Sequence, residues 1–297
     1  MSSLKKVCFI GAGTQGCQNS LRAIAAGFKV SVFDISQQAL DAMKQRQLAL
    51  VDPYAEVYGF DSSALTRGID EIGKTTDLDE SLDGADLINE SLPEQMDLKL
   101  EFYTNLESRV ADTTLLTTNT SSLPITPMSE VLKVPGRFAA LHFNGITRLS
   151  DVMPAPATTA ETLTQLEDFS RNIKLIPITL KKDVPAYISN NILIARLQEA
   201  IELVLNGCTS IEDVDRSLGM IQSYIGPFAQ MDRVGLDVMR DIFQGAAERT
   251  GNAATARAAA FVAEYVERGE LGTKSGKGFY TYPNATWEQG EAFLKGL

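Results

Sequence analysis

Residues 5–34 constrain the fold of this sequence more than any other stretch. An unbroken apolar run at 7–10 is typical of a strand buried on both faces of a parallel sheet. Three glycines in the pattern GxGxxG follow at once, and a second apolar run at 30–33 leads directly to Asp34. Strand, glycine-rich turn, helix, strand and acidic residue in this order predict a dinucleotide-binding βαβ unit.

The glycines and the acidic residue of this unit have separate roles. Gly11 permits the tight turn, Gly13 lets the backbone approach a pyrophosphate, and Gly16 allows the helix to pack closely on the strand. The amides at the start of the helix favour phosphate. Asp34 lies eighteen residues after Gly16, where a carboxylate accepts both ribose hydroxyls and repels a 2′-phosphate. NAD is therefore favoured over NADP, and the alternative is a glycine-rich turn with an aspartate that caps a helix.

Composition narrows the class of protein. The 297 residues suffice for two domains, and 44% hydrophobic and 22% charged residues are ordinary for a globular enzyme. The 38 acidic residues outnumber the 27 basic ones, which argues against a nucleic-acid partner. Three cysteines without a CxxC pair indicate reduced thiols and no structural metal. The first strand begins too early for a signal peptide and no apolar run reaches about 18 residues, so we expect a cytoplasmic protein that binds no membrane.

Further apolar runs follow at intervals that fit strands joined by crossovers. We expect strands at 75–78, 85–90, 114–118, 137–143 and 174–180, with helices at 37–50 and 96–107. Crossovers of a dozen or more residues place successive strands parallel to one another. The sequence therefore predicts an α/β fold with a Rossmann, doubly wound parallel sheet that binds NAD over residues 1–183.

Beyond the segment KKDVP at 181–185 the periodicity becomes helical. Apolar residues recur at threes and fours from Tyr187 to Gly207, and further helical stretches fit 211–218, 227–250 with a break near Gly235, and 253–268. We expect an all-α C-terminal domain over residues 184–297 that helps to bind substrate. Its alanine-rich helices carry more apolar surface than a small domain buries, which favours a homodimer formed through these helices.

His142 is the only histidine of the chain and stands at the carboxyl end of a predicted strand. Open α/β sheets bind ligands at this edge, and an imidazole exchanges protons near neutral pH. We therefore expect His142 to be the catalytic base of an alcohol oxidation, with a buried core histidine as the alternative. Asp151, nine residues on, can reach the second ring nitrogen and orient the ring.

Two further sets of polar residues fall at the same predicted edge. Ser121 follows the strand at 114–118, so its hydroxyl can face the cleft, although a serine here can equally cap a helix. Glu90 and Glu94 are followed by Lys99, which fits either a solvated helix start or the rim of a cofactor site. Both pairs of alternatives stay open on the residues alone.

With these residues placed, the chain resembles the L-3-hydroxyacyl-CoA dehydrogenase family over nearly its full length. The matching segments come in the family's order and are GAGTQG, NESLPEQMDLK, NTSSLPI, LHFN, KKDVPAYISNN, GPFAQMDRVGLD and GTKSGKGFYTY. Several segments in one order are far more specific than any single one. The resemblance implies an NAD-dependent oxidoreductase that interconverts a 3-hydroxyacyl substrate, as a CoA thioester, with its 3-keto product, using a dyad of His142 and a carboxylate.

The resemblance also implies site residues of two kinds. Ser121 and Asn190 bond the substrate's oxygen, and Asn144 is a further asparagine of the substrate cleft. The residues implied to bind the cofactor are Gly11, Gly13, Gly16, Asp34, Glu90, Lys99 and Asn119.

The segment after His142 departs from the family pattern. The family reads HFFNP and has a glutamate twelve residues beyond the histidine, whereas this chain reads HFNG and has a loop about three residues shorter. Aligned from the far side of the loop, Asp151 takes the place of the glutamate. A gap placed elsewhere puts Met153 or Pro154 there and removes the dyad.

Two observations leave the substrate open. The family's PGFxxNR becomes PAYISNN at 185–191, which keeps Asn190 and loses the arginine. Residues 47–73, where a CoA-binding protein needs basic side chains, supply only Arg67. Dehydrogenases of free hydroxy acids, such as those of carnitine and L-gulonate, therefore remain alternatives. The family also resembles lens λ-crystallin, so a cofactor-binding structural protein with little turnover is a third hypothesis.

Overall fold

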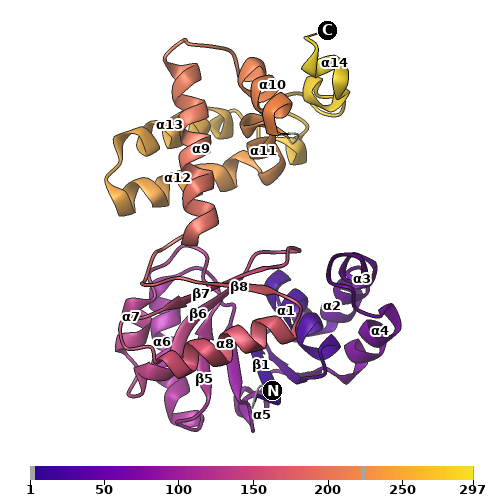
Figure 1. Cartoon of the computed structure of the whole chain (residues 1–297), viewed down its shortest axis with the longest axis vertical. Coiled ribbons are helices and arrows are strands. Elements are labelled where there is room, and N and C mark those ends of the chain that lie inside the picture. Colours follow the sequence, from indigo (N-terminus) through magenta and orange to yellow (C-terminus); the bar gives the residue numbers. More distant parts are fainter. Residues whose placement is uncertain (1–3, 223–224, 297) are drawn as a thin grey trace. The chain divides into compact units, whose positions relative to one another are not determined.

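The computed structural model describes residues 4–222 and 225–296. The chain forms two compact units, one ending at Tyr187 and the other beginning at Ile188, and each is described by itself (Figure 1). The sequence places the domain boundary after residue 183. The sequence also predicts that residues 1–183 bind the cofactor and that residues 184–297 bind substrate and form a dimer, and these roles stay predictions.

A sheet of eight strands forms the centre of the first unit. Its strands are β1 Lys6–Ile10, β2 Lys29–Phe33, β3 Gly73–Thr75, β4 Leu87–Glu90, β5 Leu115–Thr118, β6 Phe138–Phe143, β7 Leu149–Pro154 and β8 Ile176–Thr179. Their order in the sheet is β3-β2-β1-β4-β5-β6-β7-β8. The order reverses direction between β1 and β4, the place where such sheets bind ligands at the carboxyl ends of their strands. The predicted doubly wound α/β sheet is confirmed.

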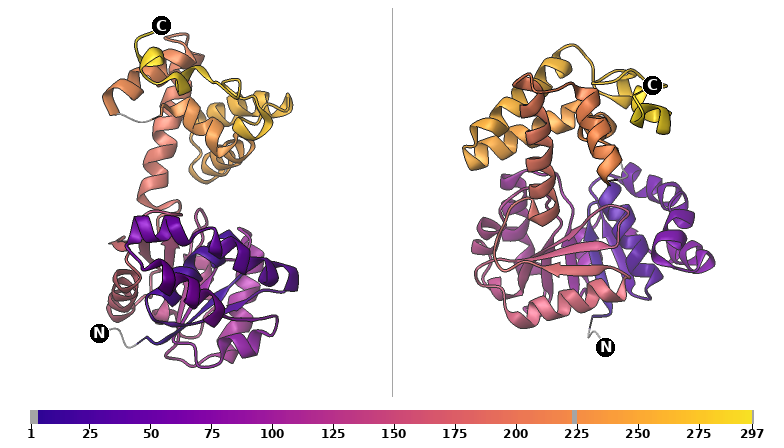
Figure 2. Two further views of the ribbon diagram at one scale, coloured as in Figure 1. Left: turned by 90° about the vertical axis from the view of Figure 1, so that its right-hand side faces the viewer. Right: turned by 45° about the horizontal axis from the view of Figure 1, so that its top comes forward.

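Helices cover both faces of this sheet (Figure 2). They are α1 Thr14–Ala25, α2 Gln37–Leu48, α3 Val51–Tyr58, α4 Ser62–Glu71, α5 Leu78–Leu82, α6 Met96–Leu106, α7 Thr126–Glu130 and α8 Ala160–Asn172, with short 3-10 helices at Glu107–Arg109 and Pro135–Arg137. Because side chains alternate along a strand, Val7 and Phe9 of β1 pack in one core with α1 to α4 and α8. Cys8 and Ile10 pack in the other core with α5, α6 and α7.

Two details of the sheet differ from the prediction. The strand expected at 75–78 is wrong: β3 ends at Thr75, because the Asp77 carboxylate accepts from the backbone N–H of Glu80 and so starts α5. The sheet is also not wholly parallel, since β6 and β7 pair antiparallel. A parallel neighbour needs a crossover of about a dozen residues or more, and the connection between these strands is too short for one.

The second unit is helical, and α9 begins at the last residue of the first unit. Its elements are α9 Tyr187–Leu205, α10 Ile211–Gln222, α11 Pro227–Val234, α12 Leu236–Thr250, α13 Ala253–Glu267 and α14 Glu291–Leu294, with 3-10 helices at Thr273–Ser275 and Thr286–Gln289. Gly235, at φ 104°, separates α11 from α12, which confirms the predicted break. Within residues 4–222 and 225–296, no helix has both the length and the apolar run that a membrane crossing requires.

Two buried carboxylates organise the core of the second unit. Asp215 accepts from the backbone N–H groups of Phe228 and Ala229 and from the Tyr280 hydroxyl, each at 2.8 Å. Burial raises the pKa of Asp215 to about 6, although these hydrogen bonds act in the opposite direction. Burial also raises the pKa of Asp232. Both carboxyl groups therefore bind protons more readily in the folded chain than in the unfolded one.

This difference predicts a pH dependence of stability. Between the ordinary pKa of 3.8 and about 6, the folded state keeps the proton on Asp215 that the unfolded state has lost, so the free energy of unfolding falls as pH rises. The contribution lost by pH 7 is about 3 kcal/mol. Urea unfolding at pH 4 to 7, followed by the fluorescence of the single tryptophan, Trp287, measures it in wild type and Asp215→Asn.

The difference in free energy between the two proteins removes the contributions of titrating groups that do not interact with Asp215. We expect this difference to shrink as pH rises from 4 to 6, while Asp241→Asn, which changes an exposed aspartate, tracks wild type at every pH. A wild-type minus Asp215→Asn difference that stays constant over this range would contradict the prediction.

Candidate functional site

The glycine-rich turn after β1 has the geometry that a pyrophosphate needs. Gly11 has φ 104°, and a Cβ built on it would lie 2.9 Å from the carbonyl oxygen of Ser91. A Cβ on Gly16 would lie 1.8 Å from the carbonyl oxygen of Gly11, so the close packing of α1 on β1 excludes a side chain there. Gly13 is the N-cap residue of α1, and a Cβ on it meets no described atom within 4 Å. The start of α1 therefore faces open space, which fits a dinucleotide phosphate.

Asp34 is joined to this turn directly. Its Oδ2 accepts from the backbone N–H of Ala12 at 2.7 Å, and its Oδ1 from that of Ser36 at 2.8 Å. Ser36 caps α2, so the alternative of Asp34 as the helix cap is wrong. Arg46, on the last turn of α2, donates to the carbonyl oxygen of Ala12 at 3.0 Å. Arg46 lies twelve residues beyond Asp34, too far along the chain for its contact with the turn to be predicted from sequence spacing.

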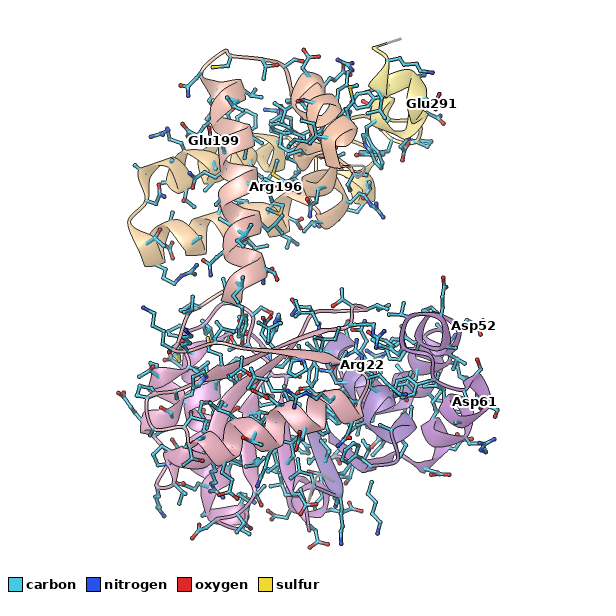
Figure 3. All side chains as sticks on the ribbon, in the orientation of Figure 1. Arg22, Asp52, Asp61, Arg196, Glu199 and Glu291 are labelled. Carbon is cyan, nitrogen blue, oxygen red and sulfur yellow. The ribbon has the colours of Figure 1, made fainter. Side chains whose placement is uncertain are left out.

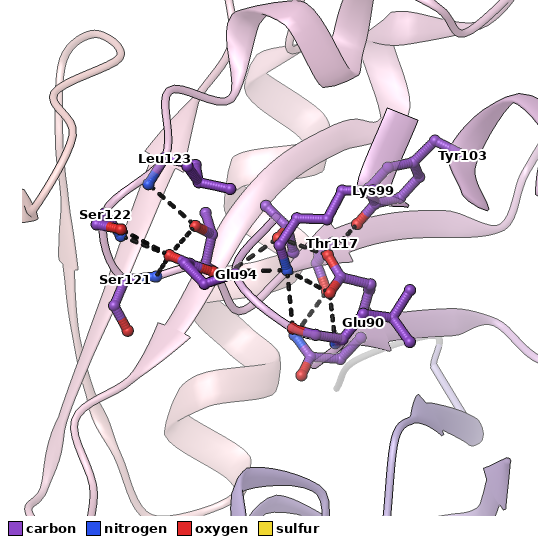
Figure 4. A network of polar contacts seen from close by, with 12 residues as sticks. Glu90, Glu94, Lys99, Tyr103, Thr117, Ser121, Ser122 and Leu123 are labelled. Carbon is purple, nitrogen blue, oxygen red and sulfur yellow. Dashed lines mark hydrogen bonds and ion pairs between the residues drawn. The ribbon is translucent and has the colours of Figure 1, made fainter. Parts of the chain in front are cut away.

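Glu90 ends β4 inside a buried polar network (Figure 4). Its carboxylate accepts from Lys99 Nζ at 2.5 Å, from Thr118 Oγ1 at 2.8 Å and from the Tyr103 hydroxyl at 3.3 Å. Glu90 and Lys99 are both buried, so a solvated helix start is the wrong interpretation for them. They form an ion pair with each other, and their contact with the cofactor stays a prediction.

Glu94 fixes the turn that follows β5. Its Oε1 accepts from Thr120 Oγ1 at 2.6 Å and from the backbone N–H groups of Ser121 and Ser122, both at 2.8 Å. Burial acts to raise the pKa of Glu94, but the Thr120 hydroxyl, the charge of Lys99 and the Ser122 donors together hold it below its ordinary value. The carboxylate is therefore a strong acceptor for this turn. Ser121 does not cap a helix, because the next helix, α7, begins only at Thr126.

His142 lies between two polar partners. Its Nε2 is 3.1 Å from Ser121 Oγ, and its Nδ1 is 3.3 Å from Asp151 Oδ2. The antiparallel register of β6 and β7 pairs His142 directly with Asp151, whereas Met153 and Pro154 pair with other residues. Only 6% of His142 and 1% of Asp151 are exposed. The structure therefore brings together the predicted histidine, serine and aspartate, and the ring is held by polar groups on both nitrogens.

The predicted asparagines fall in three different places. Asn144 Nδ2 donates to Asp151 Oδ2 at 2.7 Å, so it shares the carboxylate oxygen that faces His142. Asn119 Oδ1 accepts from the backbone N–H of Phe143 at 2.9 Å and joins the ends of β5 and β6. Asn190 lies on the first turn of α9 and belongs to the second unit. The binding roles of all three stay predictions.

A buried arginine holds the short loop between β6 and β7, which sequence reasoning missed. Arg22, in the interior of the first unit, donates to the carbonyl oxygen of Gly145 and, at 2.7 Å, to the hydroxyl of Tyr58 (Figure 3). Tyr58 in turn donates to the carbonyl oxygen of Thr147 at 2.8 Å. These contacts fix the loop that leads from His142 to Asp151. The available signal for this contact was a charged residue, Arg22, within a helix that packs on the sheet.

Comparison with known proteins matches both units. Residues 6–184 match the family described as "3-hydroxyacyl-CoA dehydrogenase, NAD binding domain", and residues 187–282 match the C-terminal domain of 3-hydroxyacyl-CoA dehydrogenase. The first match alone covers more than half of the chain. NAD is therefore the cofactor, in agreement with the open glycine-rich turn and Asp34.

Similar proteins carry several names. A probable 3-hydroxyacyl-CoA dehydrogenase of Caenorhabditis elegans is 31% identical over 95% of this chain and 94% of its own length. A 5-formyl-3-hydroxy-2-methylpyridine 4-carboxylate 5-dehydrogenase of Mesorhizobium japonicum is 27% identical over 94% and 91%. A solved diketoreductase structure is 31% identical, with a TM-score of 0.85 over 95% of this chain and 100% of that one. The chain belongs to the NAD-dependent 3-hydroxyacyl-CoA dehydrogenase family of oxidoreductases.

Proposed function

We propose that this protein interconverts a 3-hydroxyacyl substrate, as a CoA thioester, with its 3-keto product, and that His142 and Asp151 form the catalytic dyad. The observation that supports this most is the position of the His142 ring, with Ser121 Oγ at one nitrogen and Asp151 Oδ2 at the other. NAD, when bound, supplies the acceptor for the hydride that leaves the substrate carbon in the oxidation.

Side chains of the protein transfer the hydroxyl proton of the substrate and stabilise the charge that forms on His142. In the oxidation, Nε2 of His142 takes the hydroxyl proton, and in the reduction it returns the proton to the carbonyl oxygen. Asp151 holds the Nδ1–H tautomer and stabilises the imidazolium that forms. Ser121 Oγ, 3.1 Å from Nε2, bonds the oxygen that becomes the carbonyl.

Asn144 supports this dyad through the carboxylate. Its amide and the His142 ring both donate to Oδ2 of Asp151, at 2.7 and 3.3 Å. Two donors that meet on one oxygen fix the orientation of the carboxylate. We therefore assign Asn144 to the orientation of Asp151 as well as to the predicted substrate cleft.

A second candidate is a substrate without CoA, either a free 3-hydroxy acid or a small dicarbonyl compound. CoA carries phosphate groups that require basic side chains, and within residues 47–73 only Arg67 is basic. The exposed acidic residues Asp52 and Asp61 lie on the same segment. The names of two similar proteins, a pyridine carboxylate dehydrogenase and a diketoreductase, also lack CoA.

Turnover of a substrate panel tests these candidates. The protein is incubated with NAD and 3-hydroxyacyl-CoAs of several chain lengths, L-carnitine or L-gulonate, and with NADH and a dicarbonyl compound, and absorbance of NADH is followed. We expect the highest kcat/KM with a 3-hydroxyacyl-CoA. Turnover of free acids or dicarbonyls alone would favour the second candidate, and tight NAD binding with no turnover would favour a structural, crystallin-like protein.

Replacement of Asp34 tests the selection of NAD. Asp34→Ala is expected to weaken NAD binding roughly 10- to 10²-fold, since hydrogen bonds to a charged group contribute about 1.5–3 kcal/mol. The preference over NADP should narrow, because the repulsion of a 2′-phosphate is removed while Arg46 stays beside Ala12. Titration of both cofactors by fluorescence measures the two affinities.

Arg46→Ala provides the control for this experiment. In the Asp34→Ala background it should restore part of the preference for NAD, because the nearby guanidinium is lost. A wild-type protein that prefers NADP, or an Asp34→Ala variant with an unchanged ratio of affinities, would contradict the assigned role of Asp34.

We also propose that the helical unit forms a homodimer. Large apolar side chains are exposed on α9 and α10, among them Ile192 and Met220 at 65% each and Ile221 at 76%. Exposed apolar groups of this size favour a self-complementary contact between two copies. Light scattering of the wild type should give twice the mass of the chain, and Ile221→Glu should lower it; a wild-type protein that is monomeric at micromolar concentration would refute the dimer.

A further inference from the structure

Tyr187 lies directly on the ring of His142. The two rings are stacked, with centroids 4.6 Å apart and planes 8° from parallel, and both side chains are buried. Ser121 and Asp151 hold the imidazole at its two nitrogens, which fixes the ring within its own plane. The stacked tyrosine restrains the remaining motion, the tilt of the ring out of that plane.

The hydroxyl of Tyr187 contacts the turn that carries Ser121. It donates to the backbone carbonyl oxygen of Thr120 at 2.7 Å, directly before Ser121. Burial, and after it the negative charge of Asp151, raises the pKa of Tyr187 far above its ordinary value, so the hydroxyl keeps its proton. One side chain therefore contacts the His142 ring and the turn that carries Ser121.

The backbone at Tyr187 adds an independent observation. Ala186 and Tyr187 have φ of 68° and 51°, the left-handed region that residues with a side chain rarely adopt. Such conformations persist where the surrounding structure fixes them, and they cluster at functional sites. The preceding segment is fixed here: Asp183 Oδ2 accepts from the backbone N–H groups of Ile125 and Thr126. This backbone conformation places the phenol ring of Tyr187 against the face of the His142 ring.

We propose that Tyr187 is a positioning residue for the reaction, which sets the tilt of the His142 ring with its own ring and the place of Ser121 with its hydroxyl. This inference rests on the proposed function, because it takes His142 as the proton acceptor. The face of an aromatic ring also attracts a cation, so the stack favours the imidazolium that forms when the proton is taken.

Two substitutions separate the two contacts. Tyr187→Phe keeps the stacked ring and removes the hydrogen bond to Thr120, and we expect kcat to fall roughly two- to tenfold. Tyr187→Leu removes both contacts, and we expect kcat to fall on the order of 10²-fold, the usual effect of a small misplacement of a catalytic group. The KM for NAD should be unchanged in both, and Tyr265→Leu, which removes a tyrosine from the second unit, should keep the wild-type kcat.

The single histidine gives a direct readout of the stack. In protein without an affinity tag, the imidazole C–H signals in an NMR spectrum belong to His142 alone. Protons above an aromatic face are shifted upfield, so wild type and Tyr187→Phe should show upfield signals and Tyr187→Leu should not. Circular dichroism and NAD affinity verify that each variant is folded.

The outcomes distinguish this proposal from the proposed function. Unshifted His142 signals in the wild type, or a wild-type kcat in Tyr187→Leu, would overturn the positioning role while leaving His142 as the base. If Tyr187→Leu does not fold, Tyr187→Phe decides: a wild-type kcat there would overturn the role of the hydroxyl, and unshifted His142 signals would overturn the stack. Full activity of His142→Gln would instead refute the proposed function.

Discussion

His142→Gln is expected to lower kcat by about 10²- to 10⁴-fold, the usual contribution of a general acid or base, with NAD affinity unchanged. Glutamine is close to the imidazole in size and can bond Ser121 or Asp151, so the buried site loses little packing. It does not accept a proton near neutral pH. Steady-state rates in both directions and a fluorescence titration with NAD measure the two effects.

Both directions of the reaction should lose rate in this variant, because the same ring nitrogen takes and returns the proton. Ser121→Ala is a graded comparison: it removes one hydrogen bond to the reacting oxygen and leaves the base, so its loss should be smaller. An unchanged kcat in His142→Gln would refute the assignment of the base.

Asp151→Asn is expected to lower kcat by about 10²-fold or more. Replacement of the buried aspartate that orients a catalytic histidine costs about 10⁴-fold in serine proteases. Two donors, His142 Nδ1 and Asn144 Nδ2, meet on one carboxylate oxygen here. An amide removes the negative charge that holds both donors, and it presents an NH₂ group that competes for the same space. The imidazolium then loses its counter-charge and the ring loses its fixed tautomer.

A double variant tests whether Asp151 acts through the histidine. If it does, His142→Gln combined with Asp151→Asn should be no slower than His142→Gln alone, because residues that act as one unit are not additive. Asp168→Asn removes the same charge from the exposed face of α8 and should leave kcat unchanged. Additive losses in the double variant would contradict a shared role.

Local patterns in the sequence were sufficient to predict the glycine-rich turn and the position of Asp34 beside it. The strand, the glycines and Asp34 lie within thirty residues, and their spacing alone encodes the turn that the structure contains. His142 could be placed at the edge of the sheet because it lies near the carboxyl end of a strand, and these ends meet at one edge of a parallel sheet. The strand expected at 75–78 was wrong because the capping aspartate among its residues was not weighed. Asp77 is the N-cap of α5, so the chain is helical from Leu78.

The contacts that hold the site were beyond sequence reasoning because they join distant parts of the chain. Arg22 and Gly145 are 123 residues apart, and Tyr187 and Thr120 are 67 apart. No periodicity relates such residues, and their meeting depends on how the layers of the fold pack. The role of Glu94 was missed for the same reason, because the turn after β5 that it binds lies 27 residues further along the chain.

The pairing of β6 with β7 sets the distance between His142 and Asp151. Because His142 and Asp151 are opposite residues of one ladder, the connecting segment can be trimmed or lengthened at its tip without separating them. A slip of one residue in the pairing would instead carry Asp151 to the other face of the sheet. The tip can therefore vary in length and sequence while His142 and Asp151 stay opposite each other.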